Sequence, residues 1–433
     1  MSSGLHLSRL HPGVADPRMD SMRLLSETSF RYPKALSFAS GRPYEGFFEF
    51  ADLHRYLDRF VEDSLARGLP EERVKKAVFQ YGPTNGVIRD AVARMLEADE
   101  GIRVEPESIL ITHGCQEAMM IALRGLFASP DDVLLTVSPC YVGIAGAAKL
   151  LDIDIEPVPE GEDGLEAETV AEVARRVRAG GRRPVACYVT ADFSNPSGHS
   201  LPLSTRRRLL EVARDEDLLL LEDNPYGLFG RVGEEIPTLK ALDNEQRVIY
   251  LGSFAKTAFP GARVGYLVAD QPVLGGTGEP RPFAEELAKV KSMFTVNTSG
   301  VSQALIGGLL AEAGHSLRKA TRELADLYVG HLETTLRCLE EHFPQAGFAE
   351  HGVRWNVPGG GFFLLLEVPF DAGYAELETS ARDHGVAWAP MRMFYVGDGG
   401  ANVIRLGFSS LTRDELGEGI RRLAGFIKAS SPR

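Results

Sequence analysis

Apolar runs of strand length alternate with segments of helical periodicity through the middle of the chain, and this alternation restricts the possible folds most. The runs are almost continuously apolar, which is typical of strands buried on both faces. Segments with a helical pattern, 164–178 and 204–215 among them, lie between several of the runs. This order predicts an α/β fold in which helices cover both faces of a mainly parallel sheet. The expected strands are 133–139, 184–190, 217–223, 247–254 and 263–269.

The pattern changes after residue 297. A long helical segment is expected over 300–342, with a break near 313–315, followed by strands at 361–368, 386–390 and 402–409. Thr412 and Glu415 have the spacing of a capping box, which predicts a last helix that runs to about residue 429. We expect a smaller α+β domain here and an extended arm over the first 35 residues. The predicted division is 1–75 (arm and part of the small domain), 76–298 (large domain) and 299–433 (interdomain helix and small domain).

The bulk composition excludes several classes of function. The chain has 433 residues, enough for a large and a smaller domain, and its net charge of −13 disfavours a nucleic-acid partner. The four cysteines show no metal-ligand spacing, so we expect no metal site and a reducing, cytoplasmic location. No apolar run approaches the roughly 20 residues of a membrane span, and the first residues resemble no signal peptide. We therefore expect a soluble protein without membrane contacts.

Lys256 ends the motif Ser-Phe-Ala-Lys, which starts at Ser253 directly after an apolar run. A lysine just beyond a buried strand can lie in a partly dehydrated pocket, where its amine loses proton affinity and becomes a nucleophile for an aldehyde. Arg263 follows shortly and can bind a phosphate with two hydrogen bonds. A solvated lysine on a surface turn is the alternative, and the motif alone does not exclude it.

Two further motifs follow expected strands. Asp223 and Tyr226 belong to Asp-Asn-Pro-Tyr, at the end of a sheet where α/β folds bind ligands. There the carboxylate can pair with a protonated pyridine nitrogen and the phenol can donate to a ring oxygen. Asn195 begins Asn-Pro-Ser-Gly and can donate to the same oxygen. Plain Asn-Pro turns are the alternative for both motifs.

Gly114, Cys115 and Gln116 follow an expected strand and open an expected helix over 117–127. The free backbone N–H groups and the dipole of a helix N-terminus form a seat for phosphate, although a simple glycine-led helix start is also possible. Dinucleotide and Walker-type phosphate loops are absent from the sequence. Each motif is modest by itself. Together they supply, within one α/β domain, a phosphate seat, a ring-oxygen donor, a ring-nitrogen acid and a reactive lysine.

In this combination the sequence resembles the class I/II aminotransferases of the fold-type I pyridoxal-phosphate enzymes, and within them the 2-aminoadipate/kynurenine aminotransferase-like subgroup. The resemblance covers roughly 36–426. It implies a large domain of mainly parallel sheet between helices, a smaller α+β domain, a homodimer and pyridoxal 5'-phosphate as cofactor. The motifs that carry it are SFASGRP (37–43), YGPTNG (81–86), THGCQEA (112–118), SPCY (138–141), FSNPSG (193–198), EDNPYG (222–227), GSFAKTAFPGARVGY (252–266), PGGGFF (358–363) and NVIRLGFS (402–409).

The resemblance also implies a role for each matching residue. Lys256 would carry the cofactor as a Schiff base and move the proton, Asp223 would hold the pyridine nitrogen, and Asn195 and Tyr226 would hold the ring oxygen. Arg405, an arginine within an apolar strand, would bind the substrate α-carboxylate with help from the backbone at Gly41. Tyr141 would stack on the ring, although it and Tyr81 can also be core aromatics. The residues implied for the phosphate are Gly114, Cys115, Gln116, Ser253, Arg263 and, from a partner subunit, Tyr81.

Three positions depart from the subgroup and bear on the substrate. Cys115 stands where serine is common, His199 where arginine or lysine is frequent, and Arg42 where an aliphatic residue is usual. Arg42 lies beside an aromatic segment, which suggests a pocket for an aromatic amino or oxo acid whose polar tip Arg42 contacts. Packing of the arm is the alternative role for these aromatics, which are Tyr44, Phe47, Phe48 and Phe50.

The implied reaction is a ping-pong transfer of an amino group from an amino acid to a 2-oxo acid. Aromatic or arylglycine-type substrates are the favoured class, and 2-aminoadipate or aliphatic substrates stay open. The same anchors serve lyases, decarboxylases and oxidases of this fold, which the motifs do not exclude. Regulators of the MocR type carry a similar domain behind a helix-turn-helix domain. The short segment ahead of residue 36 and the acidic charge disfavour that class.

Overall fold

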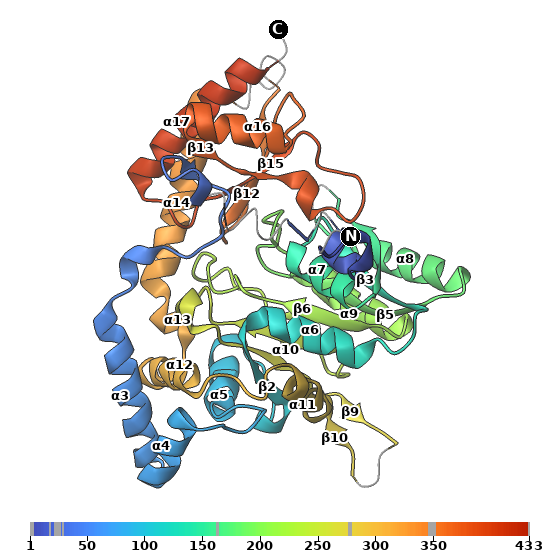
Figure 1. Cartoon of the computed structure of the whole chain (residues 1–433), viewed down its shortest axis with the longest axis vertical. Coiled ribbons are helices and arrows are strands. Elements are labelled where there is room, and N and C mark those ends of the chain that lie inside the picture. Colours follow the sequence, from blue (N-terminus) through green and yellow to red (C-terminus); the bar gives the residue numbers. More distant parts are fainter. Residues whose placement is uncertain are drawn as a thin grey trace.

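The computed structural model describes residues 4–16, 19–20, 27, 30–161, 164–275, 279–344 and 352–431. A larger domain with a long central sheet occupies the lower part of Figure 1, and a smaller domain that contains the C-terminus lies above it. The long helix α14 (Arg322–His342) runs up into the smaller domain (Figure 1). In the described part of the chain, no helix has both the length and the apolar character needed to cross a membrane.

The larger sheet has, within the described residues, seven strands in the order β2-β8-β7-β6-β5-β3-β4. Strand β8 is antiparallel to β2 and β7, and the other neighbours pair in parallel. The mainly parallel sheet expected from the sequence is therefore confirmed. Its strands are β2 (Ile109–Thr112), β3 (Asp132–Ser138), β4 (Asp154–Pro159), β5 (Arg183–Val189), β6 (Leu219–Asp223), β7 (Val248–Ser253) and β8 (Gly265–Val268).

Two of these strands begin later than the apolar pattern predicts. Asp217 has a φ of 41° and Arg263 has a φ of 52°, so both residues lie in the left-handed region and form turns. A strand needs extended backbone, and each strand therefore starts only after its turn. For Arg263 the turn places the side chain ahead of β8, at the edge where β7 ends.

Helices cover both faces of the sheet, as the strand pattern predicts (Figure 1). Alternate residues of one strand face opposite layers: Ile249 packs with α6, α7 and α11, whereas Val248 packs with α8 and α9. Helices α5 and α12 cover this second face near β2. The helices are α5 (Arg89–Glu100), α6 (Gly114–Leu126), α7 (Val142–Leu150), α8 (Ala167–Ala179), α9 (Leu203–Asp215), α10 (Leu239–Leu242), α11 (Phe283–Phe294) and α12 (Gly300–Glu312).

The smaller domain packs helices against an antiparallel sheet of order β11-β12-β15-β14. Its core surrounds Trp388, which is completely buried with Phe38 from the N-terminal part of the chain. The capping box at Thr412 is confirmed, because the Glu415 carboxylate accepts a hydrogen bond from the Thr412 backbone N–H at 2.8 Å. The elements are β11 (Arg354–Trp355), β12 (Phe363–Glu367), α16 (Tyr374–Thr379), β13 (Val386–Ala387), β14 (Ala389–Pro390), β15 (Val403–Gly407) and α17 (Arg413–Ser430).

The predicted break in the long helical segment is confirmed between α12 and the short helix α13 (Leu317–Ala320). Gly314 and His315 have positive φ values of 61° and 60° there. Asp99, at the end of α5, caps α13 by accepting hydrogen bonds from the Ser316 hydroxyl and the Leu317 N–H, both at 2.6 Å. A second turn at Thr321, which the sequence pattern does not indicate, separates α13 from α14.

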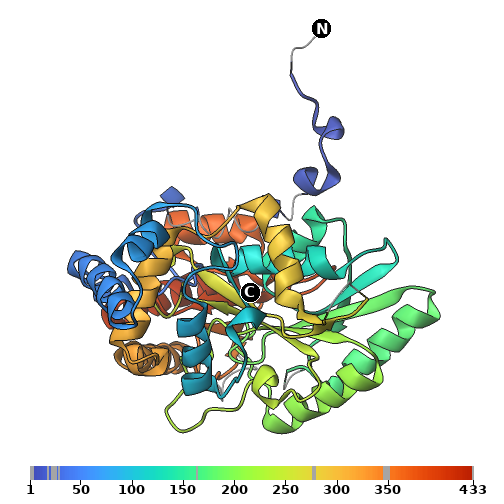
Figure 2. The same cartoon turned by 90° about the horizontal axis from the view of Figure 1, so that it is seen from below.

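The predicted arm falls partly outside the described residues. The described part contains a turn at Leu7–Arg9, which extends away from the body of the molecule (Figure 2), and the short helix α1 (Pro12–Ala15), which contacts α7. The chain joins the smaller domain at β1 (Leu36–Ser37), which pairs in parallel with β13. It then forms α3 (Phe50–Ala66) and α4 (Glu71–Phe79) beside the larger domain (Figure 1).

Helices α3 and α12 lie side by side, and a glycine permits their close approach (Figure 1). A Cβ atom added at Gly308 would lie 1.7 Å from the Tyr56 carbonyl oxygen, so the helices would have to separate. Gly425, in the exposed surface of α17, has no atom within 4 Å of such a Cβ.

We predict opposite effects for alanine at these two glycines. Gly308→Ala should lower the free energy of unfolding by about 1–3 kcal/mol, because overpacking at a backbone contact outweighs the gain in helix propensity. The matched change Gly425→Ala should raise it by about 0.5–1 kcal/mol through propensity alone. Urea unfolding measures both values. A stabilising Gly308→Ala would contradict the close helix contact.

Candidate active site

The described residues enclose a cavity of about 370 Å³ at the edge where β5, β6 and β7 end, below the smaller domain. Almost all of the residues singled out in the sequence line it. Gly114 lies behind the cavity against Arg263, and Tyr81 lies outside it. The lining contains Gly41, Arg42, Cys115, Gln116, Tyr141, Asn195, Asp223, Tyr226, Ser253, Lys256, Arg263 and Arg405, together with Phe30, Ala39, Ser40, Met119, Thr190, Pro225, Ala255 and Phe363.

Lys256 projects from the turn after β7 into the cavity, where its Nζ atom donates a hydrogen bond to the Gly41 carbonyl oxygen at 2.7 Å. Removal of the amine from water lowers its pKa to about 8, and the positive charges of Arg405 and Arg263 act in the same direction. A lysine with this pKa is partly neutral near pH 7. The sequence-based expectation of a dehydrated, nucleophilic amine therefore has a structural basis.

Asp223 is the last residue of β6, and its carboxylate is buried. The Tyr188 hydroxyl donates to Oδ2 at 2.5 Å, and the Cys115 thiol donates weakly to Oδ1 at 3.5 Å. Burial raises the pKa of Asp223 to about 6, although these two hydrogen bonds and the charge of Lys256 favour the ionised form. Above that pH the site therefore contains a carboxylate that can bind a protonated ring nitrogen.

One end of the cavity has the features of a phosphate site. Helix α6 begins at Gly114, three residues before the predicted start, so its first-turn N–H groups face the cavity end. Gly114 has a φ of +71°, and a Cβ atom there would lie 2.5 Å from a terminal nitrogen of Arg263. Among the described residues that line the cavity, Asp223 is the one carboxylate, and its partners are Tyr188 and Cys115 and not this arginine. The arginine and the helix N-terminus fit an anionic group.

Arg405 lies in β15 with only 2 % of its surface exposed. One terminal nitrogen donates to Oδ1 of Asn195 at 2.5 Å and the other to the Ala39 carbonyl at 2.6 Å. Its guanidinium lies between the rings of Phe363 and Phe394, at 4.1 and 4.6 Å from their centroids. Burial lowers its pKa to about 10, and its Nε atom has no hydrogen-bond partner among the described residues. This buried cation needs an anionic ligand.

Burial also raises the pKa of the phenols of Tyr141 and Tyr226 well above the ordinary range, so both stay protonated hydrogen-bond donors. The pKa of Tyr226 is raised further by Tyr141 and lowered by the charge of Arg405. Tyr226 also contacts Phe363 edge to face, with ring centroids 5.6 Å apart. Tyr141, Tyr226 and Phe363 thus give the cavity an aromatic wall, and the Lys256 Nζ atom lies 6.0 Å from the centroid of the Tyr226 ring.

The structure adds residues that sequence reasoning missed. Tyr188 lies within the apolar strand β5, where alternation makes it look like an ordinary core aromatic. Phe363 and Phe394 enclose Arg405 from separate elements, so only the fold brings them together. Thr190 belongs to the turn after β5, and Ser40 belongs to the SFASGRP motif. Their closeness in the sequence to site motifs is the one feature that could have indicated a place in the cavity for these two residues.

Arg42 and the aromatic segment lie mostly beside the cavity. Arg42 is exposed at the rim, where its Nε atom donates to the Ser40 hydroxyl at 3.0 Å. Phe47, Phe48 and Phe50 line a neighbouring hollow of about 700 Å³ instead, and Tyr81 is 81 % exposed. In the described residues no group of three or more His, Cys, Asp or Glu side chains is arranged to hold a metal ion.

We predict that acetylation of Lys256 in the ligand-free protein depends on pH with a midpoint near the lowered pKa. The neutral amine is the reactive form, so the rate should rise with pH and reach half of its plateau near pH 8. In the urea-unfolded chain the same lysine should reach half-plateau near about 10.4. Peptide mass spectrometry after timed acetylation measures both profiles, and identical midpoints would refute the dehydrated pocket.

Comparison with known proteins identifies the family. Residues 56–423 match the model for "Aminotransferase class I and II". The (S)-3,5-dihydroxyphenylglycine transaminase of Amycolatopsis orientalis is 46 % identical, over 99 % of this chain and 96 % of that protein. The aromatic-amino-acid aminotransferase 1 of Thermococcus litoralis is 29 % identical, over 97 % and 98 %.

The solved structures agree with this assignment. The alpha-aminoadipate aminotransferase of Thermus thermophilus, complexed with N-(5'-phosphopyridoxyl)-L-leucine, superposes with a TM-score of 0.80 at 29 % identity, over 98 % of this chain and 99 % of that chain. The expected fold-type I architecture is thereby confirmed. The chain belongs to the class I and II aminotransferase family and is a pyridoxal-phosphate-dependent aminotransferase.

Proposed function

We propose that this aminotransferase acts on arylglycines or closely related aromatic amino acids, with a 2-oxo acid as the second substrate. The observation that carries the proposal is the 46 % identity, over 99 % of the chain, to an enzyme named for (S)-3,5-dihydroxyphenylglycine. The aromatic wall of Tyr141, Tyr226 and Phe363 supports it, because it offers apolar contacts to a ring. The volume of about 370 Å³ has to hold cofactor and substrate together, which favours a compact side chain.

We assign the cofactor ring to five residues that lie at or just beyond the ends of the parallel strands. Lys256 would hold pyridoxal phosphate covalently through Nζ, and Asp223 would bind the ring nitrogen. Asn195 and Tyr226 donate hydrogen bonds to the ring oxygen, and Tyr141 stacks on the ring. Their common location in the cavity supports these roles, and so do the hydrogen bonds that the Asp223 carboxylate accepts from Tyr188 and Cys115.

The two ends of the cavity take the two anionic groups. Gly114, Cys115, Gln116, Ser253 and Arg263 hold the phosphate at the start of α6. Arg405 binds the substrate α-carboxylate at the opposite end, with the backbone of Gly41 beside it. The unpaired Nε atom of Arg405 and the guanidinium of Arg263 support this division, since the one carboxylate among the described residues of the cavity lining, Asp223, pairs with neither arginine.

The proton transfers depend on the Lys256 amine. When bound, pyridoxal phosphate supplies a ring that withdraws electrons from the α-carbon of the substrate. When Nζ is not bonded to the cofactor, its lowered pKa would leave a neutral fraction that can take the α-proton of the substrate and later give it back. Arg405 fixes the α-carboxylate so that this proton faces Nζ. The ionised carboxylate of Asp223 would favour the protonated form of the ring nitrogen.

We also propose a homodimer in which Tyr81 completes the phosphate site of the partner subunit. Tyr81 is exposed, and so are the nearby apolar side chains of Phe79, Met293 and Val296. We further propose a cytoplasmic location, in line with the few cysteines, and only small-molecule substrates as ligands, in line with the net charge of −13. The division 1–75, 76–298 and 299–433 is kept as our proposal for the domains.

We predict that borohydride reduction in the presence of pyridoxal phosphate labels Lys256 and no other lysine. Lys256→Arg should carry no label and should lose activity by a factor on the order of 10²–10⁴, because no amine of suitable pKa remains to move the proton. Peptide mass spectrometry locates the label. A label on another residue in the wild type would contradict the assignment.

We predict that a panel of amino donors with one fixed 2-oxo acid acceptor ranks arylglycines first in kcat/KM, ahead of leucine and 2-aminoadipate. Chromatography of the 2-oxo acid products measures the ranking, and a preference for leucine would overturn the substrate class.

Arg42→Leu should reduce kcat/KM for 3,5-dihydroxyphenylglycine more than for unsubstituted phenylglycine, because Arg42 lies at the rim where ring hydroxyls would point. An unchanged ratio of the two kcat/KM values would remove Arg42 from the proposal.

A further inference from the structure

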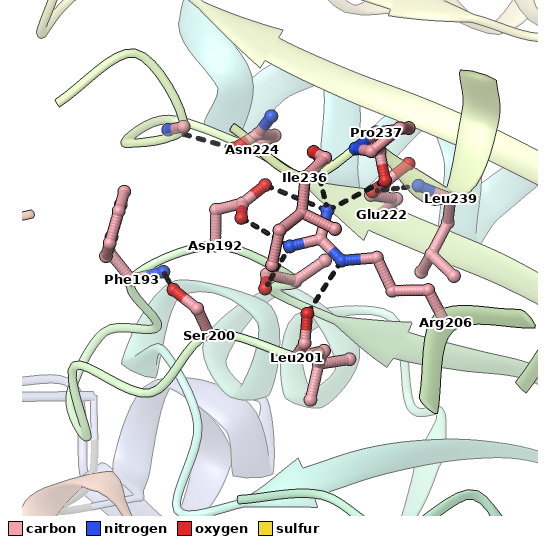
Figure 3. A network of polar contacts seen from close by, with 12 residues as sticks. Asp192, Phe193, Ser200, Leu201, Arg206, Glu222, Asn224, Ile236, Pro237 and Leu239 are labelled. Atoms are coloured by element: carbon pink, nitrogen blue, oxygen red, sulfur yellow. Dashed lines mark hydrogen bonds and ion pairs between the residues drawn. The ribbon is translucent and has the colours of Figure 1, made fainter. Parts of the chain in front are cut away.

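Arg206 is a completely enclosed cation that lies outside the active-site cavity. It belongs to the first turn of α9 and has no exposed surface. A positive charge at a helix N-terminus opposes the helix dipole, so its presence there requires compensation from elsewhere. Figure 3 shows the compensation: a ring of acceptors surrounds the guanidinium on every side.

The five N–H groups of the guanidinium face acceptors from two loops. Nε donates to the Leu201 carbonyl at 2.9 Å, and one terminal nitrogen donates to the Ala191 carbonyl at 3.1 Å. The other terminal nitrogen donates to the Pro237 carbonyl at 3.1 Å and the Ile236 carbonyl at 3.4 Å. Both terminal nitrogens also donate to the two carboxylate oxygens of Asp192 (Figure 3).

The first of these loops carries Asn195. Ala191 and Leu201 form its base, where the Leu201 N–H also donates to the Ala191 carbonyl at 2.9 Å. The loop is compact, because the Ser194 N–H donates to the His199 carbonyl at 2.8 Å and the Gly198 N–H donates to the Ser194 carbonyl at 2.6 Å. Arg206 therefore fixes both ends of a closed loop whose tip contacts Arg405.

The second loop follows Asp223 and Tyr226 and leads to α10. Glu222, the neighbour of Asp223, accepts hydrogen bonds from the Leu239 and Lys240 N–H groups at 2.8 Å, just beyond the carbonyls that Arg206 binds. One buried cation thus connects the segments that follow β5 and β6. These two segments present Asn195, Asp223 and Tyr226 to the cavity.

We propose that Arg206 is a positioning residue for the amino-transfer reaction: it fixes the loop that aims the Asn195 amide at Arg405 and at the cofactor ring oxygen. The proposal rests on the roles proposed above for Asn195 and Arg405. Lysine is not an equivalent replacement, because its three N–H groups radiate from one atom and cannot reach both ends of the loop and Asp192 together.

The test uses the holoenzyme with Arg206→Lys and, as a matched control, Arg183→Lys. Arg183 makes a two-pronged pair with the buried Asp132 at 2.7 and 2.8 Å, at the opposite end of the strands. Arg206→Lys should raise KM for phenylglycine on the order of tenfold, with a smaller change in kcat, as expected when a hydrogen bond to a charged group is weakened. Its absorbance titration should also shift, because the ring oxygen loses a well-placed donor. Arg183→Lys should lower Tm only.

Three outcomes decide the matter. A lower Tm for Arg206→Lys with unchanged KM and absorbance titration would reduce Arg206 to a structural role and overturn the proposal. If Arg206→Lys does not fold, Asp192→Asn replaces it, and this variant should shift KM and the titration in the same directions. Arg405→Lys distinguishes failure of the proposed function from failure of the positioning role. If Arg405→Lys leaves KM unchanged, the proposed carboxylate site is wrong. If Arg405→Lys raises KM but Arg206→Lys does not, only the positioning role of Arg206 is refuted.

Discussion

The active site depends on one reversal of strand direction within an otherwise parallel sheet. Strands β2, β5, β6 and β7 all end at the same edge, and each is followed by site residues. Because β8 runs the opposite way between β2 and β7, its beginning lies at that edge too. Arg263, just ahead of β8, therefore lies next to the start of α6. A fully parallel sheet would place this arginine at the far end of the strands, away from Gly114.

This arrangement gives the cavity a charge opposite to that of the chain. The protein has a net charge of −13, yet the described residues that line the cavity include Lys256, Arg263, Arg405 and, at the rim, Arg42 against the single carboxylate of Asp223. Burial lowers the pKa of both Lys256 and Arg405, and the charges of Arg405 and Arg263 lower the pKa of Lys256 further. Cofactor phosphate and substrate carboxylate are the groups that would neutralise them.

The sequence predicted the sheet, the break near Gly314 and the capping box at Thr412, because these depend on local pattern and backbone chemistry. It also predicted the residues directly after strands, since parallel strands bring their ends together whatever the details of packing. It could not predict Tyr188, whose position in an apolar strand looks like core, or Arg206, which looks like any charged residue of an amphipathic helix. Long-range contacts give these two residues their environment, and no local pattern encodes such contacts.

The Asp99 cap on α13 ties the larger domain to the segment of chain that leads into the smaller domain. The Asp99 carboxylate of α5 accepts hydrogen bonds from the Ser316 hydroxyl and the Leu317 N–H, and these bonds fix the turn after α12. These hydrogen bonds join residues more than 200 positions apart in the chain and hold the start of α13 against the end of α5. Insertion of a single residue near the end of α5 would turn the Asp99 carboxylate away from α13. The position of the smaller domain over the cavity would then change, although no group that contacts a ligand would have changed.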